Sequence, residues 1–358
     1  MKDNPPFPNG TPMRPLVTII LPTYNVEPYL RQCLDSIVNQ TIRDIQLICV
    51  NDGSTDGSLA ILKEYADRDS RIEVIDQENQ GGGSARNAGY PYIRGQYTYF
   101  VDPDDWLELN LCEKASKKME ETNADVIYID YFREYPGVSL RPSRKFSPEL
   151  SGSCIAPEHR VLLLNSCNST WRKFWKSEFL LDHQIYFSEG KRPCNDIAQN
   201  WHGCVLAGQI AILDEPLYHH RCLRPGSYQT ILKRSHFVII DTMNEVGATL
   251  RKIGKYDEYG NIYLTSRLTY FLNKYLRLAN EYRAEFCQLV LEALTEEDRQ
   301  FLHSASAKKL PWKVRAFYRM LERQGFFEMT TFRIHGMCSE LERYIRKNII
   351  NRLKYIFR

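Results

Sequence analysis

Residues 16–50 read LVTIILPTYNVEPYLRQCLDSIVNQTIRDIQLICV, and two continuous apolar runs in this stretch flank a segment with apolar residues at helical spacing. The runs at 16–21 and 45–50 predict buried β-strands, and the segment at 27–39 predicts an amphipathic helix. Continuous apolar strands joined by a helix are typical of a parallel sheet that helices cover on both faces. The stretch therefore predicts an α/β fold.

The same alternation continues to residue 101. We expect helices over 56–68 and about 83–93, and strands over 72–76 and 97–101. In a mainly parallel sheet, ligands bind beyond the carboxyl ends of the strands, so the polar residues after each apolar run are the candidates for chemistry. These stretches are PTYN at 22–25, NDGSTD at 51–56, QENQG at 77–81 and DPDD at 102–105.

Three carboxylates crowd the end of the fourth strand, at Asp102, Asp104 and Asp105. Like charges so close together repel unless a cation neutralises them, and a hard divalent ion also keeps positions for phosphate oxygens. The run therefore predicts a divalent metal and a nucleotide diphosphate. Asp is also favoured at helix N-termini, so for Asp105 a role as a helix cap is the alternative.

The second and third strand ends carry less specific signals. NDGSTD alone is typical of a turn and a helix cap, but its place beside the acidic run favours contact with a nucleoside. The stretch GGGSARN at 81–87 opens a helix, and its glycines allow close approach of a ligand to the backbone. Within it, the side chain of Arg86 suits recognition of phosphate or carboxylate.

The motifs VTIILPTYN, VNDGSTDGS, QENQGGGSARNAG and YFVDPDDW occur in this order over residues 15–110, and the stretch closely resembles family 2 glycosyltransferases, which have a GT-A fold. The resemblance implies that Thr23, Tyr24 and Asp52 contact the nucleoside and that Asp102 lies near the ribose. It also implies that Asp104 takes the metal, Mn²⁺ or Mg²⁺. The full set expected to bind the donor is Pro22, Thr23, Tyr24, Asp52, Arg86 and Asp102.

The resemblance extends more weakly to about residue 230, where it places the acceptor site. The family usually has Glu-Asp before a helix, with the Asp as general base, whereas this chain has Cys194-Asn195-Asp196. Asp196 is therefore the expected catalytic base and Asn195 a candidate acceptor contact, and an N-cap role of Asp196 is compatible with catalysis. A histidine completes the metal shell in some relatives, which makes His220 a candidate ligand; a structural role is the alternative.

Beyond residue 106 we expect a helical region that follows a mixed segment. The expected elements are helices near 107–120, 158–165 and 195–206, strands at 125–131, 209–213 and 216–220, and helices from about 232 with a linker near 303–311. The expected domains are a tail at 1–14, a GT-A catalytic domain at 15–230 and a helical region at 231–358. The catalytic domain divides into a nucleotide-sugar half at 15–106 and an acceptor half at 107–230.

The last segment, at 332–358, has the pattern of a basic amphipathic helix. Such a helix either lies on an anionic membrane surface, where lipid-linked acceptors are found, or packs on the catalytic domain. No run of about 20 apolar residues and no signal peptide is present, which favours a cytoplasmic protein, at the inner face of the membrane if this helix binds lipid.

Composition narrows the function classes further. The net charge of +3 argues against a nucleic-acid partner. The ten cysteines include no C-x-x-C pair, which favours reduced, buried thiols over a zinc or disulfide framework. A processive polysaccharide synthase is set aside because membrane spans and a Gln-x-x-Arg-Trp motif are absent from the sequence.

Taken together, these features predict an inverting glycosyltransferase that moves a hexose or N-acetylhexosamine from a nucleotide-sugar, expected to be a UDP-sugar, to a glycan or lipid-linked acceptor. The expected pathway is bacterial surface polysaccharide synthesis, such as that of lipopolysaccharide or capsule. The alternative is a catalytically inactive sugar-nucleotide-binding or scaffold protein, which the altered segment at 194–196 motivates.

Overall fold

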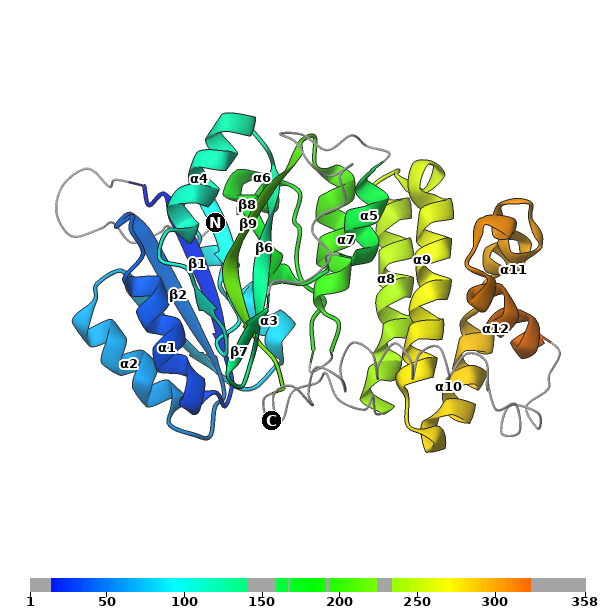
Figure 1. Ribbon diagram of the computed structural model, residues 1–358, viewed down its shortest axis with the longest axis horizontal. Helices are drawn as coiled ribbons and strands as arrows, with labels where there is room; N and C mark the ends of the chain where they lie inside the picture. Colours follow the sequence, from blue (N-terminus) through cyan, green and yellow to red (C-terminus); the bar gives the residue numbers. More distant parts are fainter. Residues whose placement is uncertain (1–13, 141–158, 167, 191–192, 224–233, 323–358) are drawn as a thin grey trace. The chain divides into compact units, whose positions relative to one another are not determined.

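A computed structural model of the chain describes residues 14–140, 159–166, 168–190, 193–223 and 234–322 (Figure 1). The described residues divide into two compact units. The first comprises 14–133 and the described part of 140–222, and the second comprises 134–139 and the described residues from 223 to 322. The expected tail at 1–14, apart from its last residue, and the expected terminal helix at 332–358 lie outside the described residues.

Four parallel strands form one half of the sheet in the first unit. They are β1 (Val17–Thr23), β2 (Ile45–Asp52), β3 (Ile72–Gln77) and β4 (Tyr97–Phe100), in the spatial order β3-β2-β1-β4. Each strand lies where the apolar runs predicted it. Because β1 lies between β2 and β4, the strand order reverses at β1, which is where ligands bind in sheets of this kind.

Three helices connect these strands: α1 (Glu27–Val38), α2 (Ser58–Arg68) and α3 (Gly82–Ala88). The helix expected over 83–93 is wrong in its second half, since α3 ends at Ala88 and a 3-10 turn follows at Tyr90–Tyr92. Pro91 explains the early end, because the residue before a proline is disfavoured in the α conformation.

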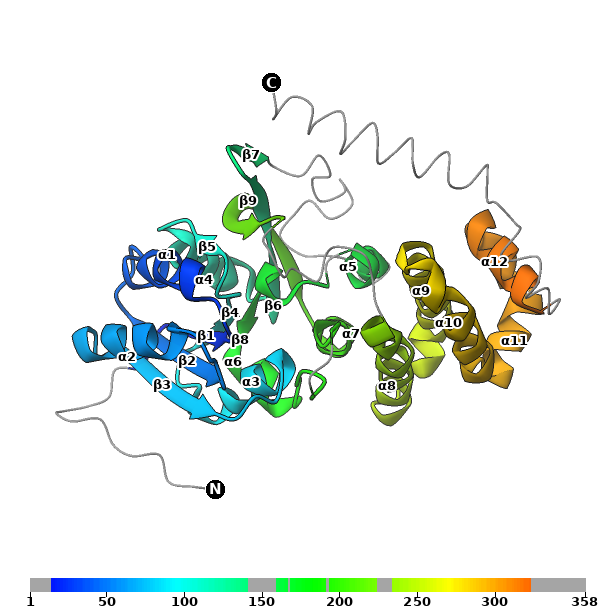
Figure 2. The ribbon, with the colours of Figure 1, turned by 90° about the horizontal axis from the view of Figure 1, so that it is seen from below.

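Helices cover both faces of the parallel half. Figure 2 shows α1 and α4 (Leu111–Thr122) on one face and α3 on the other. The first face holds a large apolar core in which alternate residues of β1, such as Ile19 and Leu21, pack with α1, α2 and α4. This burial fixes the register of the strands and holds their carboxyl ends at one level, with Thr23 opposite Asn51 and Asp52 opposite Gln77.

Beyond β4 the sheet includes antiparallel pairs. Strand β8 (Lys173–Lys176) pairs antiparallel with β4 and with β6 (Val126–Tyr135), and β5 (Trp106–Leu107) pairs antiparallel with β9 (Ile210–Arg221). With β7 (Val138–Leu140) beside β6, the described residues form a mixed sheet of nine strands. The sheet is thus parallel from β3 through β4, where strands and helices alternate, and it contains antiparallel pairs beyond β4.

The second half of the first unit differs in several details from the expected elements. The runs at 209–213 and 216–220 form the single strand β9, and the helix expected from 107 begins at Leu111 because Trp106 and Leu107 belong to β5. Strand β8 and helix α6 (Ser177–Asp182) were not predicted. The remaining helices are α5 (Arg160–Ser166) and α7 (Asp196–Leu206).

The second unit is helical where the sequence predicted helices. Its members are α8 (Ile239–Lys252), α9 (Tyr256–Arg277), α10 (Asn280–Ala293), α11 (Glu296–His303) and α12 (Trp312–Glu322). The expected linker at 303–311 contains a 3-10 turn at Ser306–Lys309. A buried ion pair joins Arg267 of α9 to Asp298 of α11. None of the helices in the described ranges is long and apolar enough to cross a bilayer.

The described cysteines match the expectation of buried thiols. All seven are free, and six are buried: Cys33, Cys49, Cys112, Cys204, Cys222 and Cys287. Cys194, beside the expected catalytic base, is partly exposed. Burial raises the pKa of the Cys33, Cys49 and Cys112 thiols well above the ordinary range.

Candidate functional site

The loops that follow β1 and β2 are joined to each other by side chains of the first loop. The side-chain oxygen of Asn25 accepts a hydrogen bond from the Thr55 N–H at 2.8 Å, and the Glu27 carboxylate accepts one from the Gly57 N–H at 2.7 Å. These bonds align the two strand ends with each other. They also leave the ring of Tyr24, which is 48% exposed, at the surface beyond β1.

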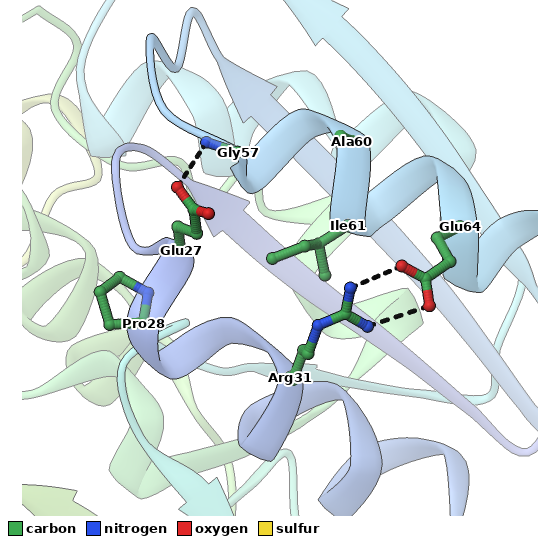
Figure 3. Close-up of a pocket in the computed structure, with 7 residues that line it drawn as sticks. All are labelled: Glu27, Pro28, Arg31, Gly57, Ala60, Ile61 and Glu64. Carbon is green, nitrogen blue, oxygen red and sulfur yellow. Dashed lines mark hydrogen bonds and ion pairs between the residues drawn. The ribbon is translucent and has the colours of Figure 1, made fainter.

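A pocket of about 520 Å³ lies between α1 and α2 near these loops (Figure 3). The Glu27–Gly57 hydrogen bond lies at one end and the Arg31–Glu64 ion pair, at 2.6 Å, at the other. None of the residues expected to bind the donor lines this pocket. The candidate site therefore lies at the strand ends and outside this groove.

Asp52 holds the loop that follows β3. Its carboxylate is buried and accepts hydrogen bonds from the Gln77 side chain and from the backbone N–H groups of Gln80 and Gly81, each at 2.8 Å. Gly53 has a φ of 70°, and a Cβ there would lie 2.7 Å from the Asn79 nitrogen, so only glycine fits. Asp52 orders the strand end, and its contact with a nucleoside stays a prediction.

Arg86 connects the expected donor and acceptor residues. Its Nη2 lies 2.6 Å from the Asp102 carboxylate, and its Nη1 donates to the side-chain oxygen of Asn195 at 3.4 Å. The guanidinium also packs over the ring of Phe187, with 5.2 Å between Cζ and the ring centre. The structure thus brings together Arg86 of α3, Asp102 after β4 and Asn195 before α7, three residues that the sequence had assigned to different roles.

The acidic run divides into an inner and an outer part. Asp105 is buried and accepts hydrogen bonds from the Tyr218 hydroxyl and the Arg221 N–H, both at 2.7 Å. Burial raises the pKa of this carboxyl to about 6, against the opposing effect of His220. The alternative role as a helix cap is wrong, because α4 begins at Leu111 with Asn110 at its N-cap.

Asp105 also explains the position of His220. The imidazole Nδ1 lies 3.2 Å from the Asp105 carboxylate, and the ring stacks on Trp171 with 5.2 Å between the ring centres. Burial favours the neutral ring, but the hydrogen bond and the charge of Asp105 outweigh it and raise the pKa of His220. His220 therefore has the structural partner that the alternative interpretation required, and its role as a metal ligand stays a prediction.

Asp102 and Asp104 form the outer part of the run, and both side chains are partly exposed. Among the described residues, no three His, Cys, Asp or Glu side chains gather as a closed metal cage. Mg²⁺ and related ions at nucleotide sites commonly use one or two carboxylates and take the remaining oxygens from phosphates and water. The partly exposed carboxylate of Asp104 fits a site of this open kind, whereas Asp102 is paired with Arg86.

Asp196 is the first residue of α7, and the N-cap position belongs to Asn195. Burial raises the pKa of Asp196, while the charges of Lys173 and Arg86 lower it in part. Lys173 is buried and donates to the carbonyl oxygens of Asn168 and Ser169, at 2.8 and 3.1 Å. The N-cap role proposed for Asp196 is therefore wrong, and the environment suits a proton acceptor.

Helix α3 holds the segment that leads to Asp196. The side chain of Asn87 bonds both the N–H and the C=O of Phe187, each at 3.0 Å, and the Gly190 N–H donates to the Ser84 hydroxyl at 3.1 Å. A Cβ on Gly83 would lie 2.1 Å from the Ser188 carbonyl oxygen. This contact between α3 and residues 187–190 was not predicted from the sequence, because the glycine run was expected to admit a ligand. Gly83 instead permits close packing of these residues on α3.

Comparison with known proteins shows which sequences this chain resembles. Residues 18–178 match the family described as Glycosyl transferase family 2. The chain is 30% identical over 253 residues to the putative glycosyltransferase EpsH of Bacillus subtilis, which covers 68% of this chain and 72% of EpsH. It is 33% identical over 259 residues to the glycosyltransferase GlyA of Streptococcus pneumoniae, which covers 66% of this chain but only 35% of GlyA.

Among solved structures, residues 1–349 of S. aureus TarS in complex with UDP-GlcNAc align with a TM-score of 0.62 at 21% identity. The alignment covers 86% of this chain and 92% of the TarS chain. This likeness confirms the predicted fold, an α/β GT-A sheet followed by helices.

Proposed function

This chain belongs to glycosyltransferase family 2, and from that premise we propose that it is an inverting transferase of bacterial surface polysaccharide synthesis. The donor would be a UDP-sugar that carries a hexose or N-acetylhexosamine, and the acceptor a glycan or lipid-linked glycan. A lipid-linked acceptor would bring the reaction to the inner face of the cytoplasmic membrane. The observation that carries the proposal is the Arg86 bridge between Asp102 and Asn195, the residue before Asp196.

The donor side rests on residues that end the parallel strands. The exposed Tyr24 ring offers a face for a nucleobase, and Pro22 and Thr23 form the buried strand end beneath it. Asp102 would contact the ribose, and Arg86, which is paired with it, would contact the diphosphate. A divalent ion held by Asp104 would neutralise charge on the diphosphate.

The acceptor side rests on Asp196. Its carboxylate would remove the proton from an acceptor hydroxyl while that oxygen attacks the anomeric carbon from the face opposite the nucleotide. A single displacement of this kind inverts the configuration, so an α-linked donor gives a β-linked product. General-base assistance of this kind is worth about 10² to 10⁴ in rate.

The alternative of an inactive sugar-nucleotide-binding protein was motivated by the missing Glu before Asp196. Asp196 nevertheless stands at the start of α7, close enough to Arg86 and Lys173 for their charges to act on its pKa. The loss of the Glu therefore does not by itself favour the inactive alternative.

A donor screen tests the proposal directly. Purified full-length protein with Mn²⁺ is incubated with UDP-, GDP- and dTDP-sugars and a glycan acceptor, and nucleotide diphosphate release is measured. We expect release with UDP-sugars that depends on the metal and on Asp104. Nucleotide binding without turnover for every donor would favour the inactive alternative, and no binding at all would overturn both.

A further inference from the structure

The second unit contains a pocket of its own, unrelated to the strand ends. It has a volume of about 240 Å³ and lies where α11 ends and α12 passes the turn at Ser306–Lys309. A water molecule occupies about 30 Å³ in the liquid, so the pocket has room for about eight waters or one small ionic group. Its lining residues are Leu302, His303, Ser304, Ala307, Lys308, Arg315, Tyr318, Arg319 and Glu322.

The lining is positively charged. Lys308, Arg315 and Arg319 oppose a single carboxylate, that of Glu322, which lies 3.5 Å from His303. Arg315 and Arg319 are one turn apart on α12, a spacing at which like charges destabilise a helix. In the described part of the chain, neither guanidinium has an ion pair or a hydrogen bond. An anion between them would remove this repulsion.

Buried polar groups of the same lining also make no hydrogen bond. Tyr318 is 1% exposed, and its hydroxyl has no partner among the described residues. The same holds for the buried Nε of Arg315. Buried donors without a partner are rare in folded proteins, because each has given up its bonds to water. Burial and the charge of Asp298 raise the pKa of the Tyr318 hydroxyl, which lies near the buried Arg267–Asp298 pair. The guanidinium nitrogens of Arg315 and Arg319 are therefore the donors that the pocket offers to a ligand.

We propose that this pocket binds a phosphate group. Arginine forks present paired N–H donors that match phosphate oxygens, and a lysine adds a single ammonium donor. Phosphate is compact and anionic and accepts several hydrogen bonds at once, so it can bind Arg315, Arg319 and Lys308 together. The phosphate belongs either to a soluble phosphate compound or to the headgroup of a lipid.

Calorimetric titration of the full-length protein with inorganic pyrophosphate tests the proposal. EDTA is present so that metal-dependent binding at the strand ends does not contribute. We expect Arg319→Gln and Arg315→Gln each to weaken binding by about tenfold, the effect of losing a hydrogen bond to a charged group. Arg319 is exposed and Arg315 partly exposed, so both variants should fold, which circular dichroism checks.

Two comparison variants separate this pocket from other cationic surfaces. Lys252→Gln removes one exposed positive charge of α8, and Lys63→Gln removes one of α2, both outside the pocket. Both should bind pyrophosphate like the wild type. Equal affinity of Arg319→Gln and wild type, or loss of binding in Lys252→Gln to the same degree, would overturn the proposal.

A second experiment distinguishes a lipid headgroup from a soluble phosphate compound as the source of the phosphate. Sedimentation with phosphatidylcholine vesicles, with and without phosphatidylglycerol, is compared for the wild type and Arg319→Gln. If the substitution also reduces binding to the anionic vesicles, the ligand is a lipid headgroup. If the substitution weakens the binding of pyrophosphate alone, the ligand is a soluble phosphate compound. The outcome does not depend on the proposed transferase activity.

Discussion

The donor end of the sheet and the segment that carries Asp196 are built in different ways. At the donor end, four strands and three helices alternate along 84 residues from Val17 to Phe100, and each strand end is ordered by its neighbours in the sheet. Between Ile185 and Asp196, the residues that the structure describes form no strand or helix. It is held in place by α3, through hydrogen bonds between residues about 100 positions apart.

The difference suggests that the donor residues and the base are positioned by different parts of the fold. The donor residues are positioned by the sheet itself, so single substitutions there should alter contacts without moving the backbone. The base is positioned by a few side chains of α3, so substitutions far from Asp196 in the sequence should alter turnover. Four predictions test this contrast.

The largest effect is expected for Asp196→Asn. The amide cannot accept the proton, so kcat should fall by about 10² to 10⁴. The affinity for the nucleotide, measured by calorimetry, should stay within about twofold because the donor end is untouched. Asp182→Asn, which changes an exposed carboxylate of α6, is the control and should leave both quantities unchanged. Full turnover in Asp196→Asn would remove this residue from the mechanism.

A pair of glycine substitutions in α3 comes next. Gly83→Ala places a methyl group 2.1 Å from the Ser188 carbonyl oxygen, so the backbone must shift, and unfolding free energy should drop by about 1–3 kcal/mol. Turnover should fall while the nucleotide still binds. Gly82→Ala meets no backbone atom, only the Nη1 of Arg86 at 3.3 Å and the Nδ2 of Asn195 at 3.7 Å, so its loss of unfolding free energy should be much smaller. Similar losses of stability in the two variants, measured by thermal denaturation, would contradict the role of Gly83 in the packing of residues 187–190 on α3.

The third prediction concerns Asn87. Asn87→Ala removes both hydrogen bonds to Phe187 and should lower the free energy of unfolding by about 1–2 kcal/mol. Because the loosened segment leads to the base, kcat should fall more than KM for the donor rises. Asn87→Asp keeps the acceptor for the Phe187 N–H but sets a carboxylate oxygen against the Phe187 carbonyl, so it should not restore the loss. A change in donor KM alone would place Asn87 on the donor side.

The smallest effect is a shift in the pH profile of kcat. A base must be deprotonated to act, and burial raises the pKa of Asp196, with Lys173 and Arg86 opposing. As the pH is lowered, kcat should therefore begin to fall at a pH above the pKa of an exposed Asp. Below the raised pKa of Asp196, kcat should fall by about tenfold per pH unit. Arg86→Gln removes one opposing charge and should move this acidic limb to higher pH. An unshifted limb would contradict the influence of Arg86 on Asp196.

The contrast also explains what could be predicted from the sequence. Strands β1 to β4 are short apolar runs with local helices between them, so periodicity alone located them and the polar residues at their ends. Strand β8 has the sequence KFWK, and Lys173 within it is buried. The carbonyl oxygens of the preceding turn stabilise this buried lysine. A strand of this kind lacks the apolar pattern by which strands are recognised in a sequence.

The same reasoning applies to the site. Asp102 and Arg86 were assigned correctly to one neighbourhood because both follow strand ends. The partners of Asp105 were not foreseen, since Tyr218 and His220 lie on β9 more than 100 residues away. The pairing of β5 with β9, which sets Trp106 opposite His219, brings them together. Antiparallel pairing over such a distance leaves no local trace in the sequence.

The distribution of the cysteines has a practical consequence. Thiols react with alkylating reagents as thiolates, so the buried, high-pKa Cys33, Cys49 and Cys112 should be labelled only when the sheet opens. Cys194 is partly exposed and lies two residues before Asp196. A single labelling time course, resolved by mass spectrometry, would thus give two rates. The fast labelling of Cys194 would report motion at the catalytic segment, and the slow labelling of the buried cysteines would report opening of the sheet beneath the donor site.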